Sequence, residues 1–421
     1  MSSHTKSPTI LPPLDLSKWR NVPMWLMVIG GIGAIAGVAT NQKQFAFSWL
    51  LAYMFFLSLC LGSLGFTMLH HLFDASWSVP VRRVLEQMSC SFKHMVYLWI
   101  PIGVFAPKLY KWMEGGWTQA TPDLATQAKH PLFTTPGFFI SSIICLLVWW
   151  WLSSQLRAWS LKQDETGSVE CTRMMRRYSA FGIFLFAFSL TTAAIMWVKA
   201  LEHEWFSTMY GVYYFAGSMW LTMITLYVIV LLLQRQGPLK PYVHDKTYYF
   251  MGSLFFAFTV FYGYVTFAQY FIIWNANMPE ETFWYVLREK GTWWDIGQII
   301  IFGHFFVPFL LLLRIDWKLK LPVMGFLFVW AWLMHFNDMA FNIGPVLHPN
   351  NYHLDWRDVA CFMLIGGILS HFFIKRLYSS PMIPQKDPRF AESQDIYVRQ
   401  PDQYVEAATT TVVEVKTGGH H

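Results

Sequence analysis

The sequence predicts an all-α integral membrane protein with about ten transmembrane helices, because its apolar stretches have the length needed to cross a bilayer. Of its 421 residues, 55% are hydrophobic and 19% are aromatic, whereas only 13% are charged. This charged share is about half of that found in ordinary soluble domains. The mean hydropathy is positive. Together these observations exclude a soluble globular protein.

Ten apolar stretches account for most of the chain. Each can cross roughly 30 Å of hydrocarbon as a helix that rises about 1.5 Å per residue. In order, they cover residues 24–41, 46–71, 93–113, 136–158, 178–199, 209–234, 247–275, 296–313, 321–340 and 358–377. We therefore expect a transmembrane domain over 24–377, between a polar segment at 1–23 and a polar tail at 378–421. The final Gly-Gly-His-His is either native or an added remnant, so it carries no weight as a metal ligand.

The loops between these stretches predict the orientation of the chain. Lys and Arg are more frequent in the loops on the side of the two termini than in the opposite loops. Basic loops tend to stay in the cytoplasm. Both termini are therefore predicted to be cytoplasmic, and the turn at 275–282 is predicted to face outward. The same loops account for the net charge of +6, which then needs no nucleic-acid partner.

The sequence contains no motif for a redox or nucleotide cofactor. Five cysteines are scattered along the chain, without the CxxC pairs of iron–sulfur and zinc sites or the CxxCH of covalent haem. A bis-histidine haem needs two facing imidazoles at matched depth, but Pro345 and Pro349 interrupt the helix around His348, the partner that spacing offers to His335. We therefore expect no catalytic residue, cofactor or metal in this chain, and a b-type haem cytochrome is the least favoured alternative.

Polar side chains inside predicted spans are the best candidates for chemistry, since such groups are costly in a bilayer. His304 lies four residues before Pro308, which removes the backbone hydrogen bond to the His304 carbonyl. His335 and Asp338 are three residues apart in the next span, and Asn342 follows on the same helix face. This pattern fits a proton relay, and it fits as well a hydrogen-bonded group that only fixes helix packing.

Two more residues are secondary candidates for a relay. His71 closes the second span beside His70, and Gln269 lies among aromatic residues of the seventh span. Those aromatic residues occupy more than one face of the helix, which lipid contact and packing explain more simply than stacking on a quinone. They are Phe261, Tyr262, Tyr264, Phe267 and Tyr270.

The seventh span runs into the sequence FAQYFIIWNANMPEET at residues 267–282. This stretch resembles the seventh-span signature of ActF, a membrane subunit of bacterial alternative complex III in the polysulfide-reductase (NrfD-like) family. The stretches MLHHLFDASWSVPVRR, HEWFSTMYGVYYFAGS, HFFVPFLLLLR and MHFNDM are similar to other segments of that subunit, in the same order. Ala268 and Asn275 replace the usual serine and tyrosine, whereas the matching positions are Gln269, Trp274, Asn277, Pro279, Glu280, Glu281 and Thr282.

The resemblance implies ten helices, arranged as two four-helix bundles plus flanking helices, in the bacterial inner membrane. It implies a subunit of a quinol oxidoreductase, with cytochrome c or another periplasmic acceptor, that is not catalytic by itself. The expected partners are a quinol-binding NrfD-like membrane subunit, a multihaem cytochrome c and an iron–sulfur protein, with a terminal oxidase as a further candidate. Haem c and iron–sulfur clusters are then expected in those partners.

One departure from the family pattern and one pair of glutamates bear on this expectation. The family usually carries an acidic residue where Met196 stands before Trp197, so any proton path must use other residues. Glu280 and Glu281 are candidates for docking the outer subunits. They equally fit the solvated start of a short interfacial helix through Trp284.

An independent ion or solute transporter is the alternative from another class. Transporters often contain broken helices around a substrate site near the bilayer midplane. The pairs Gly30-Gly31 and Gly366-Gly367 would be the places for such breaks. Because they fall in the first and last spans, close helix packing explains them more simply.

Overall fold

The computed structural model describes residues 19–113 and 124–394, and every regular element in these two ranges is a helix. Most of the predicted N-terminal segment and the tail beyond residue 394 lie outside the described residues. Among those described, eight helices are long and apolar enough to cross a membrane. They are α1 (Val22–Thr40), α2 (Gln42–Phe73), α8 (Thr135–Thr166), α9 (Val169–Trp197), α10 (Tyr210–Arg235), α11 (Asp245–Ala276), the run Trp293–Leu312 and α16 (Trp356–Ser379). The chain is therefore a multi-span, all-helical membrane protein.

One of the ten predicted spans is not a single helix. The segment at 93–113 is divided into α4 (Phe92–Leu98), α5 (Ile100–Val104), α6 (Ala106–Leu109) and the 3-10 turn η2 (Lys111–Met113). Pro101 and Pro107 lie just inside α5 and α6. Each proline lacks the N–H that would bond to the preceding turn, so the helix breaks there. The prediction of one continuous helix over this segment is wrong.

The span predicted over 321–340 does form a helix, α15 (Leu321–Ile343), but it is not among the eight most apolar ones. His335, Asn337 and Asp338 lie in its second half and lower its hydropathy. Its 23 residues are enough to cross about 30 Å of hydrocarbon. The division of the helices into two four-helix bundles remains a prediction of the resemblance.

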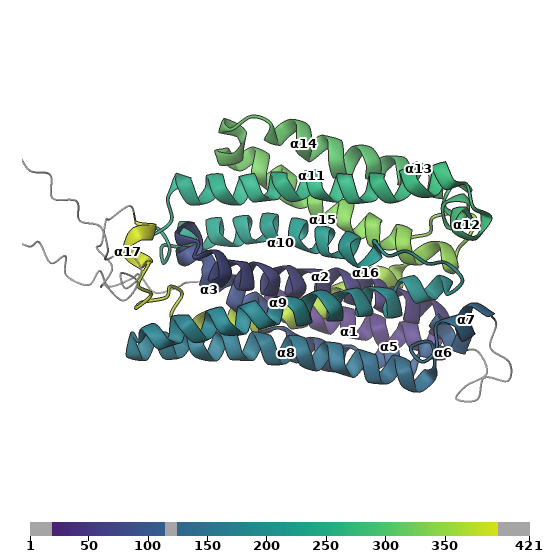
Figure 1. Cartoon of the computed structure of the whole chain (residues 1–421), viewed down its shortest axis with the longest axis horizontal. Helices are drawn as coiled ribbons and strands as arrows, with labels where there is room; N and C mark the ends of the chain where they lie inside the picture. The colour runs from purple at the N-terminus through teal and green to yellow at the C-terminus, as the bar shows by residue number, and fades with distance from the viewer. Residues whose placement is uncertain (1–18, 114–123, 395–421) are drawn as a thin grey trace, which may run out of the picture.

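The remaining helices lie at the two ends of the long ones (Figure 1). We call these the α3 end, which holds α3 (Val79–Ser89) and α17 (Phe390–Ser393), and the α12 end, which holds α12 (Pro279–Arg288) and α7 (Leu124–Ala128). Short 3-10 turns connect several helices: η1 (Ser76–Ser78), η3 (Lys199–Glu202), η5 (Asp316–Leu319) and η6 (Gly344–Val346).

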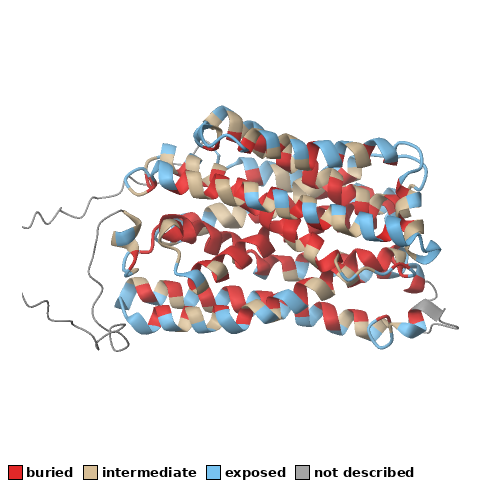
Figure 2. Cartoon of the chain, turned by 45° about the horizontal axis from the view of Figure 1, so that its top comes forward, coloured by how far each residue is buried: buried red, intermediate tan, exposed pale blue. Residues whose placement is uncertain are grey.

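Helix α2 forms the centre of the molecule, where buried residues concentrate (Figure 2). The most apolar stretch of α2 is entirely buried, whereas only 22% of the corresponding stretch of α1 is buried. Helices α1, α9, α10, α15 and α16 all contact α2. An apolar helix that is covered on every side belongs to the protein interior. Helix α2 is therefore the scaffold on which the other helices pack, and α1 faces outward.

Glycines allow the helices to approach closely at two important contacts. A Cβ atom at Gly62 of α2 would lie 2.5 Å from the Ser218 carbonyl oxygen of α10 and would collide with the Thr222 side chain. A Cβ atom at Gly30 of α1 would lie 2.5 Å from the Leu364 nitrogen of α16. At Gly30, one of the predicted glycine pairs thus serves helix packing, as small residues commonly do in membranes.

We predict that Gly62→Ala destabilises the protein by about 1–3 kcal/mol, because the added methyl group forces α2 and α10 apart. Gly325→Ala on α15 is the matched control, since nothing lies within 4 Å of a Cβ atom there. It should leave stability unchanged or raise it by up to about 1 kcal/mol through helix propensity. Thermal unfolding of both variants in the same detergent measures the difference. Equal unfolding temperatures would contradict the close contact of α2 with α10.

Candidate functional site

The predicted residues His304, His335 and Asp338 come together in the interior of the protein. His335 and Asp338 lie one turn apart on α15, and His304 comes from the run Trp293–Leu312. One nitrogen of each imidazole and one carboxylate oxygen all lie within 4.8 Å of one another. The exposed fraction is 0% for both histidines and 2% for Asp338. We call these three residues the His–His–Asp cluster.

A π-helical turn positions His304. The run Trp293–Leu312 consists of α13 (Trp293–Ile300), the π-helical turn η4 (Ile301–Phe306) and α14 (Val307–Leu312). In this turn the N–H of Val307 donates to the carbonyl of Phe302, five residues back instead of four. Such wider turns often occur at functional sites.

Two aromatic rings hold the plane of the His304 imidazole. Trp220 of α10 stacks on one side and Tyr262 of α11 on the other, each with its ring centroid 3.8 Å away. Stacking covers the two faces of the imidazole and leaves its nitrogen atoms at the edge. Tyr262 is thus a buried member of the site, whereas its predicted companions Tyr264 and Phe267 are exposed.

Hydroxyl groups orient the Asp338 carboxylate. Its Oδ1 accepts hydrogen bonds from Tyr213 and Tyr262, the latter at 2.9 Å. The side chain of Asn342 donates to the Tyr213 hydroxyl at 2.8 Å and accepts from the Tyr210 hydroxyl at 2.9 Å. Because the Tyr213 oxygen accepts from Asn342, its own proton is directed at Asp338. Asp338 Oδ2 has no partner within the described part of the chain.

Ser58 of the central helix α2 holds His335. The distance between Ser58 Oγ and His335 Nε2 is 3.0 Å, and Ser58 Oγ also donates to the Phe55 carbonyl at 2.6 Å. A hydroxyl has only one proton. Since that proton is used on Phe55, the Ser58 oxygen accepts from Nε2–H of His335. The neutral imidazole then has its lone pair on Nδ1.

A polar route continues from the site to the α12 end. Arg288 of α12 donates to the Asn342 carbonyl at 2.9 Å and forms an ion pair of 3.0 Å with Glu202. The Glu202 side chain is 12% exposed, whereas that of Arg288 is 1% exposed. The Arg288 guanidinium also lies 3.5 Å from the ring centroid of Trp284. Polar groups therefore connect the buried cluster to one end of the bundle.

The two secondary relay candidates lie outside the cluster. Gln269 accepts a hydrogen bond from Ser207 at 2.9 Å and donates to Tyr285 of α12 at 3.1 Å, so it fastens α11 to the α12 end. His71 lies in the last turn of α2, where its ring packs against that of His70. The structure thus groups three of the five relay candidates and separates the other two from them.

The candidate docking residues begin a helix, as one of the two sequence interpretations expects. Glu280 and Glu281 occupy the first turn of α12, which continues through Trp284. Glu280 is exposed and Glu281 is half-buried. Carboxylates in the first turn interact favourably with the helix dipole. Their role in docking a partner stays a prediction.

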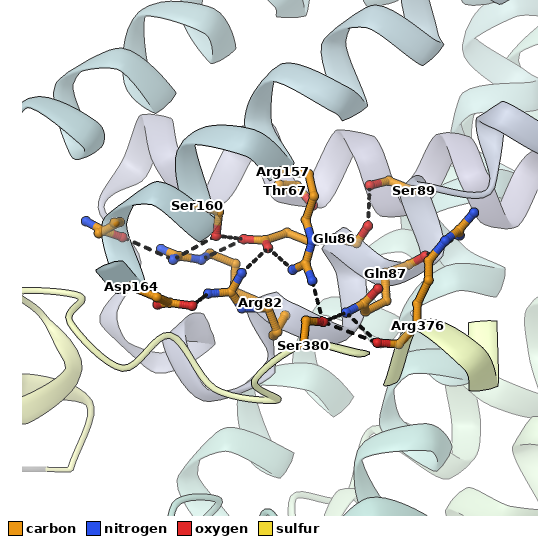
Figure 3. Close-up of polar contacts among 12 residues, drawn as sticks. Thr67, Arg82, Glu86, Gln87, Ser89, Arg157, Ser160, Asp164, Arg376 and Ser380 are labelled. Carbon is orange, nitrogen blue, oxygen red and sulfur yellow. Dashed lines mark hydrogen bonds and ion pairs between the residues drawn. The ribbon is translucent and has the colours of Figure 1, made fainter. Parts of the chain in front are cut away.

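A second buried polar cluster lies at the α3 end (Figure 3). Arg82 and Arg83, which fall between the predicted spans 46–71 and 93–113, lie in α3 and are each 1% exposed. They form ion pairs with Glu86 at 3.0 and 3.2 Å, and Arg157 of α8 reaches the same carboxylate at 2.8 Å. Ser160 adds a hydrogen bond to Glu86 of 2.7 Å. These arginines hold the helices together. From the sequence alone, they are only basic loop residues that predict the orientation of the chain.

The charges of this α3-end cluster balance. Asp164 of α8 pairs with Arg83, and Asp387 pairs with Arg82. Three carboxylates thereby face three guanidiniums, those of Arg82, Arg83 and Arg157. Burial by itself raises the pKa of Glu86, but the guanidiniums hold that pKa well below its ordinary value. Glu86 therefore stays ionised at neutral pH, as a fully paired buried charge can.

Part of the predicted polar tail packs across the α3-end cluster. Besides Asp387, Arg389 pairs with Asp74 after α2, and Gln394 donates to the Tyr242 carbonyl before α11 at 3.0 Å. Residues 380–394 therefore tie α3 to the connection between α10 and α11. This part of the predicted tail therefore packs against the helices.

Sequence reasoning missed the residues that complete both clusters. Ser58 and Tyr213 lie in ordinary apolar spans, so no local pattern marks them. Glu86 follows the arginine pair by three and four residues, a helical spacing that is a usable signal for an ion pair. Asp387 is more than 300 residues from Arg82 in sequence, so only the tertiary fold brings it there.

The His–His–Asp cluster also has the composition of a metal site. Two imidazoles and one carboxylate are donors that transition metals use in proteins. Among the described residues, this is the group of three such side chains with ligand atoms close enough to hold one ion. The geometry of this cluster does not test the sequence-based expectation that the chain binds no metal.

Comparison with known proteins identifies no family for this chain. No protein-family model matches the sequence, and a search of curated proteins finds no significant match. The resemblance to the ActF subunit thus rests on the quoted motifs alone.

We predict that Glu86→Gln lowers the free energy of unfolding by about 3–5 kcal/mol, because it leaves the buried guanidiniums of Arg82 and Arg83 and the half-buried one of Arg157 short of one negative charge. Glu170→Gln is the matched control, since Glu170 pairs with Arg173 on the surface. Its effect should stay below about 1 kcal/mol. Thermal unfolding in detergent at neutral pH provides the comparison.

The wild-type protein should also lose the contribution of Glu86 in acid. The pKa of this carboxyl is lower in the folded state than in the unfolded state. Its contribution is therefore complete above the unfolded pKa, about 4.3, and declines as the pH falls below that value. If Glu86→Gln and wild type unfold alike at pH 7, Glu86 does not hold the cluster.

Proposed function

We propose that the chain is an ActF-like membrane subunit of a quinol-oxidising respiratory complex, alternative complex III, in the bacterial inner membrane with cytoplasmic termini. The observation that carries this proposal is the ordered series of motifs between residues 45 and 345, of which FAQYFIIWNANMPEET is the most specific. The eight long apolar helices among the described residues support a multi-span membrane subunit, for which the resemblance implies ten helices. In this proposal the quinol site, haem c and iron–sulfur clusters belong to partner subunits, and the chain holds no redox centre.

Proton conduction is the second part of the proposal. The His–His–Asp cluster supplies acceptor atoms in the interior, and the route through Tyr213, Asn342 and Arg288 leads to the α12 end. A proton that enters at this end can be exchanged among the imidazoles and the carboxylate. The Asn342 amide and the Arg288 guanidinium are not proton carriers, so their part is to position Tyr213 and Glu202. Because Met196 replaces the family's acidic residue on α9, the proposed path uses Asp338 instead.

We predict that Asp338→Asn slows proton-linked quinol oxidation by the complex by about tenfold or more, since the amide cannot exchange a proton. The amide keeps the shape of the carboxylate and still accepts from Tyr213 and Tyr262, so the complex should assemble. Asp295→Asn, which changes an exposed carboxylate on α13, is the control and should leave turnover unchanged. An Asp338→Asn complex with unchanged turnover and proton stoichiometry would remove Asp338 from the path.

We predict that the tagged wild-type chain, extracted gently from its native membrane, brings haem-rich companion subunits with it. The double charge reversal Glu280→Lys and Glu281→Lys should reduce the yield of those companions severalfold, because the first turn of α12 then repels a basic docking partner. Haem absorbance and subunit composition after purification are the measurements.

Glu289→Lys, at the end of α12, is the control for that experiment, since it reverses one exposed charge outside the first turn. Unchanged companion yield in the double variant would refute docking at Glu280 and Glu281. A colourless chain without companions would refute the respiratory subunit and favour the independent transporter.

A further inference from the structure

Four atoms of the His–His–Asp cluster are buried without a hydrogen-bond partner among the described residues. They are both ring nitrogens of His304, Nδ1 of His335 and Oδ2 of Asp338. A buried polar atom without a partner is unfavourable, because it loses its hydration and gains nothing in return. Independently of this, the three side chains, from two segments of the chain, each bring one possible ligand atom to within 4.8 Å of the others. Their coincidence indicates a site for a ligand that accepts lone pairs.

The surrounding residues orient each of the three donors. Ser58 accepts from His335 Nε2–H and thereby leaves the lone pair on Nδ1. The hydroxyls of Tyr213 and Tyr262 occupy Oδ1 of Asp338 and leave Oδ2. Outer partners of this kind are typical around metal ligands, whose ring or carboxylate orientation they fix.

The backbone and the aromatic rings position the third donor. His304 lies in the π-helical turn, and Trp220 and Tyr262 cover only the faces of its ring. A metal ion binds an imidazole nitrogen in the plane of the ring, which this stacking leaves accessible. Gly217 also makes room beside His335, because a Cβ atom there would lie 3.3 Å from the imidazole carbon Cε1.

We propose that His304, His335 and Asp338 bind a divalent first-row transition metal ion of the zinc type. Two nitrogen donors and one oxygen donor suit such an ion, whereas calcium and magnesium prefer oxygen donors throughout. Zinc ligands lie about 2.0–2.2 Å from the ion, so their donor atoms are roughly 3.5 Å apart. The donors here lie within 4.8 Å of one another, so binding of the ion draws them closer together.

The metal site departs from the sequence-based expectation of a chain without a metal. It does not depend on the proposed function, because the ion binds whether or not the chain conducts protons or joins a respiratory complex. When bound, the ion occupies the lone pairs of both imidazoles. A metal-loaded cluster therefore cannot exchange protons through these atoms, so the proton conduction proposed above requires the metal-free chain.

Zinc binding to the purified full-length chain tests the proposal. The protein in detergent is stripped with a chelator, loaded with Zn²⁺ and desalted, and zinc is then measured by mass spectrometry. We expect about one zinc per chain, with nitrogen and oxygen ligands at about 2.0–2.2 Å and imidazole scattering in the zinc X-ray absorption spectrum. His304→Gln and Asp338→Asn should each lower the zinc affinity by about tenfold or more.

Ser58→Ala provides the sharpest variant, because it leaves all three donors in place and removes only the acceptor that orients His335. It should weaken zinc binding by about 10- to 100-fold. His353→Ala is the control, since His353 is an exposed histidine outside the cluster, and it should bind zinc like wild type. Thermal unfolding of each metal-free variant checks that the fold is retained.

Three results would overturn the proposal. The first is a wild-type chain that retains no zinc after loading, which would leave a water molecule or a proton as the occupant. The second is bound zinc that survives undiminished in Ser58→Ala and Asp338→Asn. The third is an absorption spectrum without imidazole ligands. The zinc test uses only the purified chain and does not involve the companion subunits. Its failure would therefore leave the respiratory assignment unaffected, and failure of the respiratory assignment would leave the zinc site unaffected.

Discussion

Lipid offers no hydrogen bonds, so every polar group between the helices of this protein must find its partner within the chain. Helix α2 shows the constraint most clearly, because its apolar stretch is entirely buried and it still carries Ser58 and two terminal histidines. The Ser58 hydroxyl satisfies both Phe55 and His335. The positions of α10, α11 and α15 follow from the same requirement, since their tyrosines and Asn342 complete one another's hydrogen bonds around Asp338.

The two buried polar clusters meet this constraint in opposite ways. At the α3 end, each carboxylate is matched by a guanidinium, and the balanced charges hold α3, α8 and residues 380–394 together. The three carboxylates of this cluster are all engaged in ion pairs, which is why we regard it as structural. The His–His–Asp cluster keeps donor atoms without partners. Among the described residues, these three are the group whose possible metal-ligand atoms also lie close together, and this convergence distinguishes a candidate site from a packing cluster.

Proline has different consequences in the different helices. Pro101 and Pro107 divide a predicted span into short pieces. Pro308 follows a π-helical turn that carries His304 into the interior. In both cases proline removes one backbone donor, but the packing around the helix decides whether the result is a break or a widened turn. Helix α15 departs from the other long helices for a different reason. Its polar residues His335 and Asp338 form the site, and they lower its hydropathy.

The sequence by itself determined the class of the protein, most of its long helices and the pairing of two site residues, His335 and Asp338. Composition and helix-length apolar stretches fix the first two, because hydrophobicity is a local property of the chain. Spacing on one helix marks His335 and Asp338, because it depends only on helix geometry. Tertiary structure alone decided that His304 joins them, that Gln269 and His71 do not, and that Ser58 and Tyr213 complete the site. It also placed Asp387 against Arg82, since contacts between distant helices depend on how the helices pack around α2, which no local pattern records.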